Sequence, residues 1–260
     1  MLLIGLDCAV NHKNIGLAIA RRTAPAQLHL QYVQQGLDLL YLQAVLAEAL
    51  QAQERILLAI DAPLGWPRQL SVSLQSHQAG QAVQLHHNET GDTKANLLFR
   101  RYTDRYARSL GYGQPLDVGA DKIARASISA LDILAELQQA LGRSIPLAWQ
   151  SESLPPISAI EVYPAATLRC AGLPSRGYKR PEQRALREDI LKGLSANIDI
   201  PSDLAEVALA NKATDALDAL VCLLCGLDFI QGRCPAPDWA SLNKAMIVQE
   251  GWMWIRDNRQ

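Results

Sequence analysis

Short apolar runs that end in an acidic residue set the pattern of this chain. Residues 2–6 are wholly apolar and lead into Asp7, which is typical of a strand buried on both faces. A polar turn over 11–14 leads to a second apolar run over 15–20, and residues 27–34 alternate between apolar and polar positions as a strand does. Because the connections are short, we expect these strands to form an antiparallel meander.

The next segment changes from the twofold repeat of strands to the spacing of a helix. Residues 37–53 carry apolar side chains at helical spacing, and the buried run 56–60 that follows ends in Asp61. A strand that follows a helix in this way is typical of a crossover, so we expect it to lie parallel to the first strand. Further along, the pattern predicts a strand over 158–162, helices over 121–141, 181–194 and 213–230, and a closing hairpin over 245–255.

Residues 66–120 are the least regular part of the chain. They are rich in Gln, His, Ser and Gly and contain no repeat. We interpret them as an insertion over the functional site that ends in a helix over 96–110. With 260 residues the chain is near the upper limit for one hydrophobic core, so we expect a single domain over 1–260.

The order of these elements indicates a fold class. Three strands, a helix, a strand, an insertion and further helix–strand units predict an α/β fold of the RNase H-like class. In such a fold an antiparallel three-strand meander and parallel strands form one mixed sheet flanked by helices. A Rossmann sheet begins strand–helix–strand instead, and the chain has neither a GxGxxG nor a Walker A motif, which removes two common α/β functions.

Composition and charge exclude only a few classes of protein. Apolar residues make up 49% and charged residues 20%, the balance of a globular protein, and the net charge of -1 excludes a chain coated in positive charge. The N-terminal segment reads as a strand rather than a signal peptide, and no apolar run approaches the roughly 20 residues of a membrane span. The 5 cysteines read as reduced thiols, so we expect a cytoplasmic protein.

Carboxylates are predicted at the carboxyl ends of strands, where α/β proteins bind ligands. Asp7, Asp61 and Glu161 hold such positions, and Asp215 and Asp218 share a face of the last long helix. Apolar neighbours surround the helical pair, and carboxylates in such a place are costly unless a cation neutralises them. Hard oxygen ligands favour Mg²⁺ or Mn²⁺. The four aspartates are therefore predicted metal ligands, and all five carboxylates are predicted catalytic residues.

Each of these carboxylates also has a structural alternative. Asp7 could cap the turn that follows it, Asp61 could open the Ala-Pro-Leu-Gly turn, and Glu161 could serve as a cap in a structured bend. One member of the Asp215 and Asp218 pair could be an exposed neighbour or a salt-bridge partner. The functional interpretation is a two-metal site, in which the cations activate water and stabilise the leaving oxygen of a phosphodiester.

Two basic segments could contact phosphate. Residues 100–108 hold four arginines against one aspartate, and residues 169–192 hold seven Lys or Arg against three acidic residues. Arg beside Tyr suits phosphate contact and base stacking, although a solvated helix face with ion pairs is the commoner outcome for charge runs. We interpret the second segment as surface. The predicted substrate-binding residues lie in the first segment and are Arg100, Arg101, Thr103, Asp104 and Arg105.

Taken together, the motifs resemble a known family. They occur in the order Gly5-Leu-Asp-Cys8, Ile60-Asp-Ala-Pro-Leu-Gly65, Arg101-Tyr-Thr-Asp104, Glu161-Val-Tyr-Pro-Ala165, Thr214-Asp-Ala-Leu-Asp-Ala-Leu-Val221 and Glu250-Gly-Trp252. Over nearly its whole length the chain resembles the predicted nucleases with an RNase H fold known as domain of unknown function 429. The resemblance implies that fold and a nuclease activity.

The resemblance also implies roles for particular residues. By similarity to Holliday-junction resolvases of the RuvC type, Asp7, Asp61 and the Asp215 and Asp218 pair fall where the metal-binding acids belong. Glu161 and the group of Arg101, Thr103 and Asp104 have no counterpart there. The chain departs from such resolvases in lacking an overall basic charge, which argues against long duplex DNA as the substrate.

The leading hypothesis is therefore a metal-dependent nuclease or phosphodiesterase that acts on nucleic acid or a nucleotide-like substrate. One alternative is a non-catalytic module that binds nucleic acid or a nucleotide on the same fold. Another is a relative of the actin-like ATPases and kinases, but that class needs a duplicated domain and glycine-rich phosphate loops, which 260 residues of this pattern do not supply. The sequence leaves the oligomeric state open.

Overall fold

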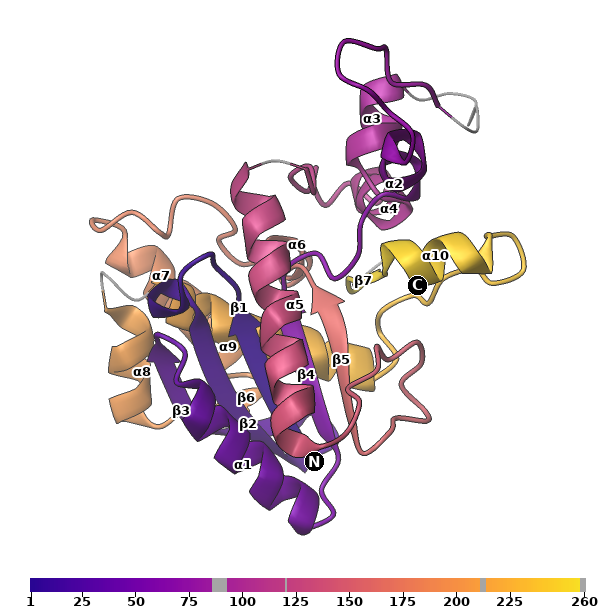
Figure 1. The fold of residues 1–260 in the computed structure, drawn as a ribbon. Helices are drawn as coiled ribbons and strands as arrows, with labels where there is room; N and C mark the ends of the chain where they lie inside the picture. The colour runs from indigo at the N-terminus through magenta and orange to yellow at the C-terminus, as the bar shows by residue number, and fades with distance from the viewer. Residues whose placement is uncertain (86–92, 120, 211–213, 258–260) are drawn as a thin grey trace.

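A mixed sheet of 7 strands lies at the centre of the molecule (Figure 1). The computed structural model describes residues 1–260 apart from 86–92, 120, 211–213 and 258–260. Within this part the strand order is β6-β3-β2-β1-β4-β5-β7. The strands are β1 (Leu2–Asp7), β2 (Gly16–Ala24), β3 (Gln27–Gln35), β4 (Ile56–Asp61), β5 (Ile157–Val162), β6 (Ile198–Asp199) and β7 (Met253–Trp254).

The strand directions confirm the predicted fold class. Strands β1, β2 and β3 form an antiparallel meander, whereas β4 pairs with β1 in parallel and β5 pairs with β4 in parallel. The short strands β6 and β7 add to the two edges, each parallel to its neighbour. A meander followed by parallel strands, with helices on both faces, is the layout of an RNase H-like fold.

Helices cover the two faces of the sheet as separate layers (Figure 1). One face packs against α1 (Leu39–Gln51) and α5 (Asp121–Leu141). The other packs against α9 (Thr214–Ile230), with α6 (Pro164–Cys170), α7 (Arg184–Leu194) and α8 (Ser202–Leu209) around it. Beyond the sheet project α2 (Arg68–Leu74), α3 (Lys94–Phe99) and α4 (Tyr102–Ser109), next to α10 (Lys244–Glu250), and a short 3₁₀ turn, η1 (His12–Asn14), follows β1.

Helix α9 fits against the sheet because two strand positions are glycine. A Cβ placed on Gly5 of β1 would lie 2.1 Å from the carbonyl oxygen of Ala219, and one on Gly16 of β2 would lie 1.8 Å from that of Asp215. The absence of a side chain at both positions lets the helix backbone approach the strands directly. Nearly every side chain of α9 is buried as a result, so the helix lies in the core rather than on it.

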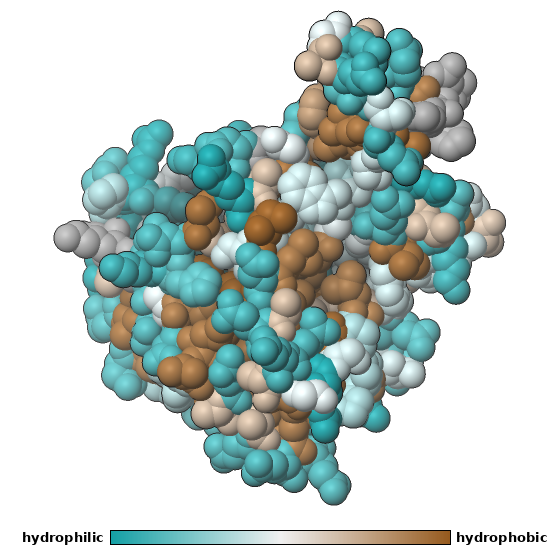
Figure 2. All heavy atoms as spheres, in the orientation of Figure 1, coloured by the Kyte–Doolittle hydropathy of each residue, from teal (hydrophilic) through white to brown (hydrophobic). Residues whose placement is uncertain are grey.

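The alternation of side chains along the strands divides the core into two halves. Leu3 of β1 belongs to the α9 side, whereas Leu2, Ile4 and Leu6 belong to the side of α1 and α5. Because this alternation has a period of two, Asp7 continues the row of Leu3 toward α9. On the face seen in Figure 2, apolar side chains gather between polar ones below the projecting α2–α4 segment.

The strands and long helices lie close to their predicted ranges, but two predictions were wrong. The predicted helix over 96–110 is two helices, because Arg100 and Arg101 are extended and the Asp104 carboxylate accepts the Arg101 backbone N–H to start α4 afresh. The predicted hairpin over 245–255 is α10 followed by β7. Asn243 caps α10, and Gly251 ends it at a φ of 82°.

Several elements were not predicted, and others differ slightly in extent. Helix α7 begins three residues after its predicted start. Helices α2, α6 and α8 and the edge strand β6 are short elements that the periodicity did not reveal. All five cysteines lie in the described part of the chain, and no disulfide joins any two of them.

The close approach of α9 gives a direct test of the packing. Gly5→Ala is expected to lower the free energy of unfolding by about 2 kcal/mol or more, because the added methyl group has no space beside Ala219. Gly226→Ala is the matched control, since a Cβ there would meet its nearest neighbours at 3.4 Å and the helix interior favours Ala over Gly. Urea denaturation measures both. Equal stability of the two variants would contradict the packing argument.

Candidate functional site

Two aspartates lie side by side at the carboxyl ends of β1 and β4. Asp7 and Asp61 are register partners in this parallel pair, so their side chains emerge on the same face of the sheet, toward α9. Both line a cavity of about 340 Å³ that also reaches Cys8, Tyr163 and Lys179. The predicted meeting of the first two carboxylates is therefore present in the structure.

A third aspartate approaches the pair from α9. Asp218 is buried, with 2% of its surface exposed, and its carboxylate is held by two residues of the segment before α7. The Tyr178 hydroxyl donates a hydrogen bond of 2.6 Å to Asp218 Oδ1, and the Lys179 ammonium forms an ion pair with Asp218 Oδ2. Asp215, three residues earlier on α9, is only partly buried and stands at the edge of this group.

Negative charge at this place exceeds positive charge. Burial, followed by repulsion from Asp218 and Asp61, raises the pKa of Asp7 well above its ordinary value. Burial and then Asp218 likewise raise the pKa of Asp61 to about 7. Burial opposes the charge of Lys179, but the attraction of Asp218 and Asp7 outweighs it and raises the pKa of the ammonium group. One lysine therefore compensates a group of carboxylates only in part.

The three aspartates offer the kind of oxygen ligands that bind divalent cations. Asp7, Asp61 and Asp218 offer hard carboxylate oxygens at the end of a parallel strand pair, the kind of ligand that Mg²⁺ and Mn²⁺ prefer. As the side chains stand, however, no three His, Cys, Asp or Glu groups of the described residues are arranged to hold an ion together. The contacts of Asp218 with Tyr178 and Lys179 occupy oxygens that an ion would need.

Glu161 lies on the opposite face of the sheet from the aspartates. In β5, Ile157 and Ala159 pack toward α1 and α5, whereas Ile160 and Val162 pack toward α9. Glu161 therefore continues the row of Ile157 and Ala159, away from α9. Its register partner on β4 is Ile60 and not Asp61, and this offset of one position separates Glu161 from the pair.

The carboxylate of Glu161 binds a fully buried arginine. Arg101 Nη1 donates to Glu161 Oε2 at 2.7 Å, and Arg101 Nη2 donates to Asp104 Oδ1 at 2.9 Å and to Glu161 Oε1 at 2.5 Å. Glu161 Oε2 also accepts the backbone N–H of Leu64, just beyond β4, at 2.9 Å. Arg101 is 0% exposed, so in this arrangement its guanidinium faces protein carboxylates and not solvent.

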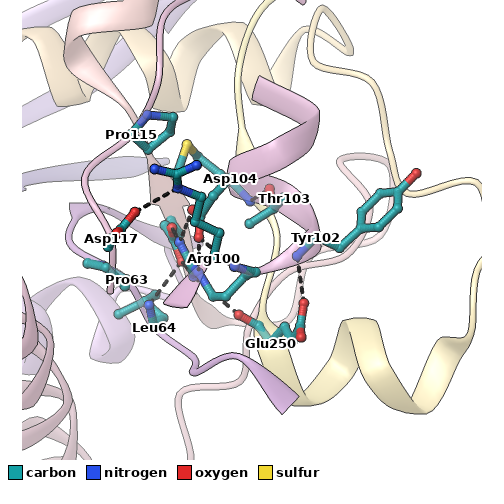
Figure 3. A network of polar contacts seen from close by, with 12 residues as sticks. Pro63, Leu64, Arg100, Tyr102, Thr103, Asp104, Pro115, Asp117 and Glu250 are labelled. Carbon is teal, nitrogen blue, oxygen red and sulfur yellow. Dashed lines mark hydrogen bonds and ion pairs between the residues drawn. The ribbon is translucent and has the colours of Figure 1, made fainter. Parts of the chain in front are cut away.

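Glu250 extends this network to the start of two helices (Figure 3). Its carboxylate accepts the backbone N–H of Arg68, the first residue of α2, at 2.8 Å and that of Tyr102, the first residue of α4, at 2.7 Å. Its backbone carbonyl accepts Arg101 Nη1 at 3.2 Å. Thr103 Oγ1 accepts the backbone N–H of Met253 in β7 at 2.9 Å. These contacts fix the base of the projecting helices to the end of the sheet.

The remaining arginines of the predicted substrate-binding segment lie nearer the surface. Arg100 is partly buried and donates to Asp117 at 2.7 Å and to Asn96. The Arg105 guanidinium lies 5.9 Å from the centre of the Tyr102 ring. The segment 100–105 is therefore divided, with Arg101, Thr103 and Asp104 buried and Arg100 and Arg105 near the surface.

The sequence interpretation missed two residues that contact the aspartates. Tyr178 and Lys179 fall within residues 169–192, which we interpreted as a basic surface segment. A signal was present, since Gly177-Tyr-Lys-Arg180 places an aromatic hydroxyl beside a cation after a glycine. Nothing in the local pattern, however, connects this segment with Asp218, which lies 40 residues from Tyr178.

Fold and site together define an α/β protein of RNase H-like layout, with acidic side chains meeting at the carboxyl ends of its central parallel strands. Residues 5–240 match the family described as "Protein of unknown function (DUF429)", and the chain belongs to that family. Neither the curated proteins nor the solved structures gave a match. Among the described residues, no helix has both the length and the apolar character needed to cross a membrane.

The raised pKa of Asp61 predicts how stability depends on pH. The folded protein binds this proton more tightly than the unfolded chain does, so the contribution of Asp61 is most favourable below about pH 4 and declines until about pH 7. Asp61→Asn should therefore be more stable than the wild type by about 1–3 kcal/mol at pH 8 in EDTA, with little difference at pH 4.

Denaturation at the two pH values measures this difference, and Asp132→Asn, at an exposed position of α5, is the control. The control should follow the wild type at both pH values. A constant offset between Asp61→Asn and the wild type from pH 4 to pH 8 would contradict the assignment.

The buried arginine predicts a large loss of stability on truncation. Arg101→Met leaves the carboxylates of Asp104 and Glu161 buried beside a group without charge, and the expected cost is about 3–5 kcal/mol of the free energy of unfolding. Arg108→Met, at an exposed position of α4, should change the free energy of unfolding by less than about 0.5 kcal/mol. Chemical denaturation compares them, and a small loss for Arg101→Met would count against a structural role.

Proposed function

We propose that this protein is a metal-dependent phosphodiesterase that hydrolyses nucleic acid or a nucleotide-like substrate. The observation that carries the proposal is the register pairing of Asp7 with Asp61, completed by Asp218 from α9 and left with uncompensated negative charge. Carboxylates grouped in this way are stabilised by cations, and hydrolysis of phosphodiesters is a reaction that cations at carboxylate sites support. The family resemblance to predicted nucleases points in the same direction.

In this proposal the aspartates hold Mg²⁺ or Mn²⁺ beside the cavity that Asp7 and Asp61 line. Such an ion, when bound, lowers the pKa of water and stabilises charge on the phosphoryl oxygens. Asp7, Asp61 and Asp218 supply the ligands, and Asp215 at the edge of the group supports them through its charge. The cavity beside them is lined by Pro115, Leu116 and Ile123 as well as by polar groups, so a bound ester would contact both apolar and polar side chains.

The buried network has a different part in the proposal. Arg101 forms ion pairs with both Glu161 and Asp104, which leaves one negative charge in excess, and these three residues form the other wall of the same cavity. They position the loop after β4, whose Leu64 N–H binds Glu161, and so keep Asp61 at the end of its strand. We therefore assign these three residues as positioning residues. Phosphate contact from the arginine segment is left to Arg100 and Arg105, which lie nearer the surface.

One observation favours a second candidate, a binding module without catalysis. Asp218 already has a hydroxyl and an ammonium partner, so the carboxylates have a counter-ion without any metal. In that case the cavity would bind a nucleotide-like ligand through Lys179 and the outer arginines, and no ester bond would be cut. Addition of Mn²⁺ would then leave the melting temperature unchanged.

The proposed activity is tested by cleavage assays with Asp7→Asn. Wild-type protein with Mn²⁺ or Mg²⁺ should cleave at least one member of a panel of single-stranded DNA, duplex DNA, RNA and an aryl phosphodiester. Asp7→Asn should lower that rate at least about a hundredfold, because it removes one ligand charge. Asp189→Asn, at an exposed position of α7, should retain the wild-type rate. Absence of cleavage of every substrate with either metal would overturn the proposal.

A further inference from the structure

Lys179 is the one side chain that brings positive charge to the aspartate group in the described part of the chain. Its ammonium forms an ion pair with Asp218 Oδ2, and it lines the same cavity as Asp7 and Asp61. Arg101 also lines this cavity, but its guanidinium is paired with Glu161 and Asp104. The lysine therefore stands where a cation would be expected.

The backbone that carries Lys179 is held in place independently of its side chain. Arg187 of α7 is fully buried, and its Nη1 donates to the carbonyl oxygens of Tyr178 and Arg180, at 2.8 Å each. The Tyr178 hydroxyl adds a further attachment to Asp218. These contacts fix the chain on both sides of Lys179, so movement of its side chain requires no movement of the loop.

The Lys179 side chain can move away from Asp218 into solvent. Its side chain is 53% exposed, in contrast to the 3% of Asp218, which is its partner in the ion pair. A lysine carries its charge on a flexible four-carbon stem, so rotation about the stem takes the ammonium into solvent. Asp218 has no such freedom because it lies on α9 within the core.

We propose that Lys179 is a built-in counter-ion that competes with the divalent cation for the aspartate group. Without metal, its ammonium occupies Asp218 Oδ2 and partly neutralises Asp7 and Asp61. A divalent ion that takes this oxygen displaces the ammonium, both because the oxygen is shared and because like charges repel at such distances. The inference rests on the proposed function for the binding of a divalent cation at these aspartates, but not for the cleavage of an ester.

Displacement has a consequence for the substrate. The released ammonium stays at the rim of the cavity on a fixed backbone, where it can bind an anionic ester that approaches the ion. Lys179 is therefore a positioning and gating residue of the aspartate site. Before metal binds, its ammonium reduces the repulsion among the carboxylates. After metal binds, it provides a positive charge at the edge of the site.

Titration calorimetry with MnCl₂ tests the competition on the full chain. Lys179→Met keeps the length of the stem and removes the charge, so it should bind Mn²⁺ about tenfold more tightly than the wild type, which corresponds to loss of one competing ion pair and its repulsion. Lys179→Arg keeps the charge and should bind Mn²⁺ about as weakly as the wild type does. Arg180→Met, at the adjacent exposed position, removes the same charge and should leave the affinity within about twofold.

Thermal unfolding gives a second readout that needs no activity. In EDTA at pH 8, Lys179→Met should melt at a lower temperature than Arg180→Met, because the carboxylates have lost their counter-ion. Saturating MnCl₂ should then raise its melting temperature by more than it raises that of the wild type. Since Lys179 is exposed, circular dichroism should show an unchanged fold for the variant.

Each outcome decides the matter. Tighter Mn²⁺ binding by Lys179→Met, with or without measurable binding by the wild type, supports the competition. Equal or weaker binding by Lys179→Met, or no binding by either protein, overturns it. If the variant binds Mn²⁺ more tightly but no phosphodiester is cleaved, the inference holds and the proposed activity fails. If cleavage depends on Mn²⁺ but the variant binds it with unchanged affinity, the activity holds and the inference fails.

Discussion

The ion pairs of the buried Arg101 guanidinium hold together the end of the sheet and the helices that project from it. It joins α4 through Asp104, β5 through Glu161 and the end of α10 through the Glu250 carbonyl, and Glu161 in turn holds the loop after β4. A buried charge is tolerated only when its partners and geometry are complete, because each ion loses its hydration. Strands β4 and β5, the projecting helices and the end of α10 are therefore tied to one another at one charged centre.

The sheet keeps this charged centre apart from the aspartate group although both reach one cavity. Asp7 and Asp61 point toward α9, whereas Glu161 points toward the opposite layer. On one wall of the cavity Arg101 is paired with two carboxylates, whereas the aspartates on the other side share Lys179 as their one cationic partner among the described residues. We therefore expect a cationic ligand in this cavity to bind on the side of the aspartates.

The sequence pattern predicted the positions of Asp7 and Asp61 at strand ends, because an apolar run that ends in an acid is a local signal. Glu161 carries the same signal, yet it faces the other way, since its orientation depends on a register offset between β4 and β5 that no local pattern contains. The arginine run suggested phosphate contact, but the partners that bury Arg101 lie 60 and 149 residues away along the chain. Lys179 was missed for the same reason, because its contact with Asp218 exists only in the folded chain.

The contact of the Glu250 carboxylate with α2 also affects the order in which parts of the chain can fold. It supplies the cap of α2 from a position 182 residues further along the sequence. At a synthesis rate of about 5–20 residues per second, the ribosome needs on the order of 10 to 40 s to deliver that cap after Arg68 has been made. During this interval the projecting helices lack the contact that closes their base. Residues made long after the projecting helices therefore complete their base, and contacts over so long a stretch of chain are slow to form.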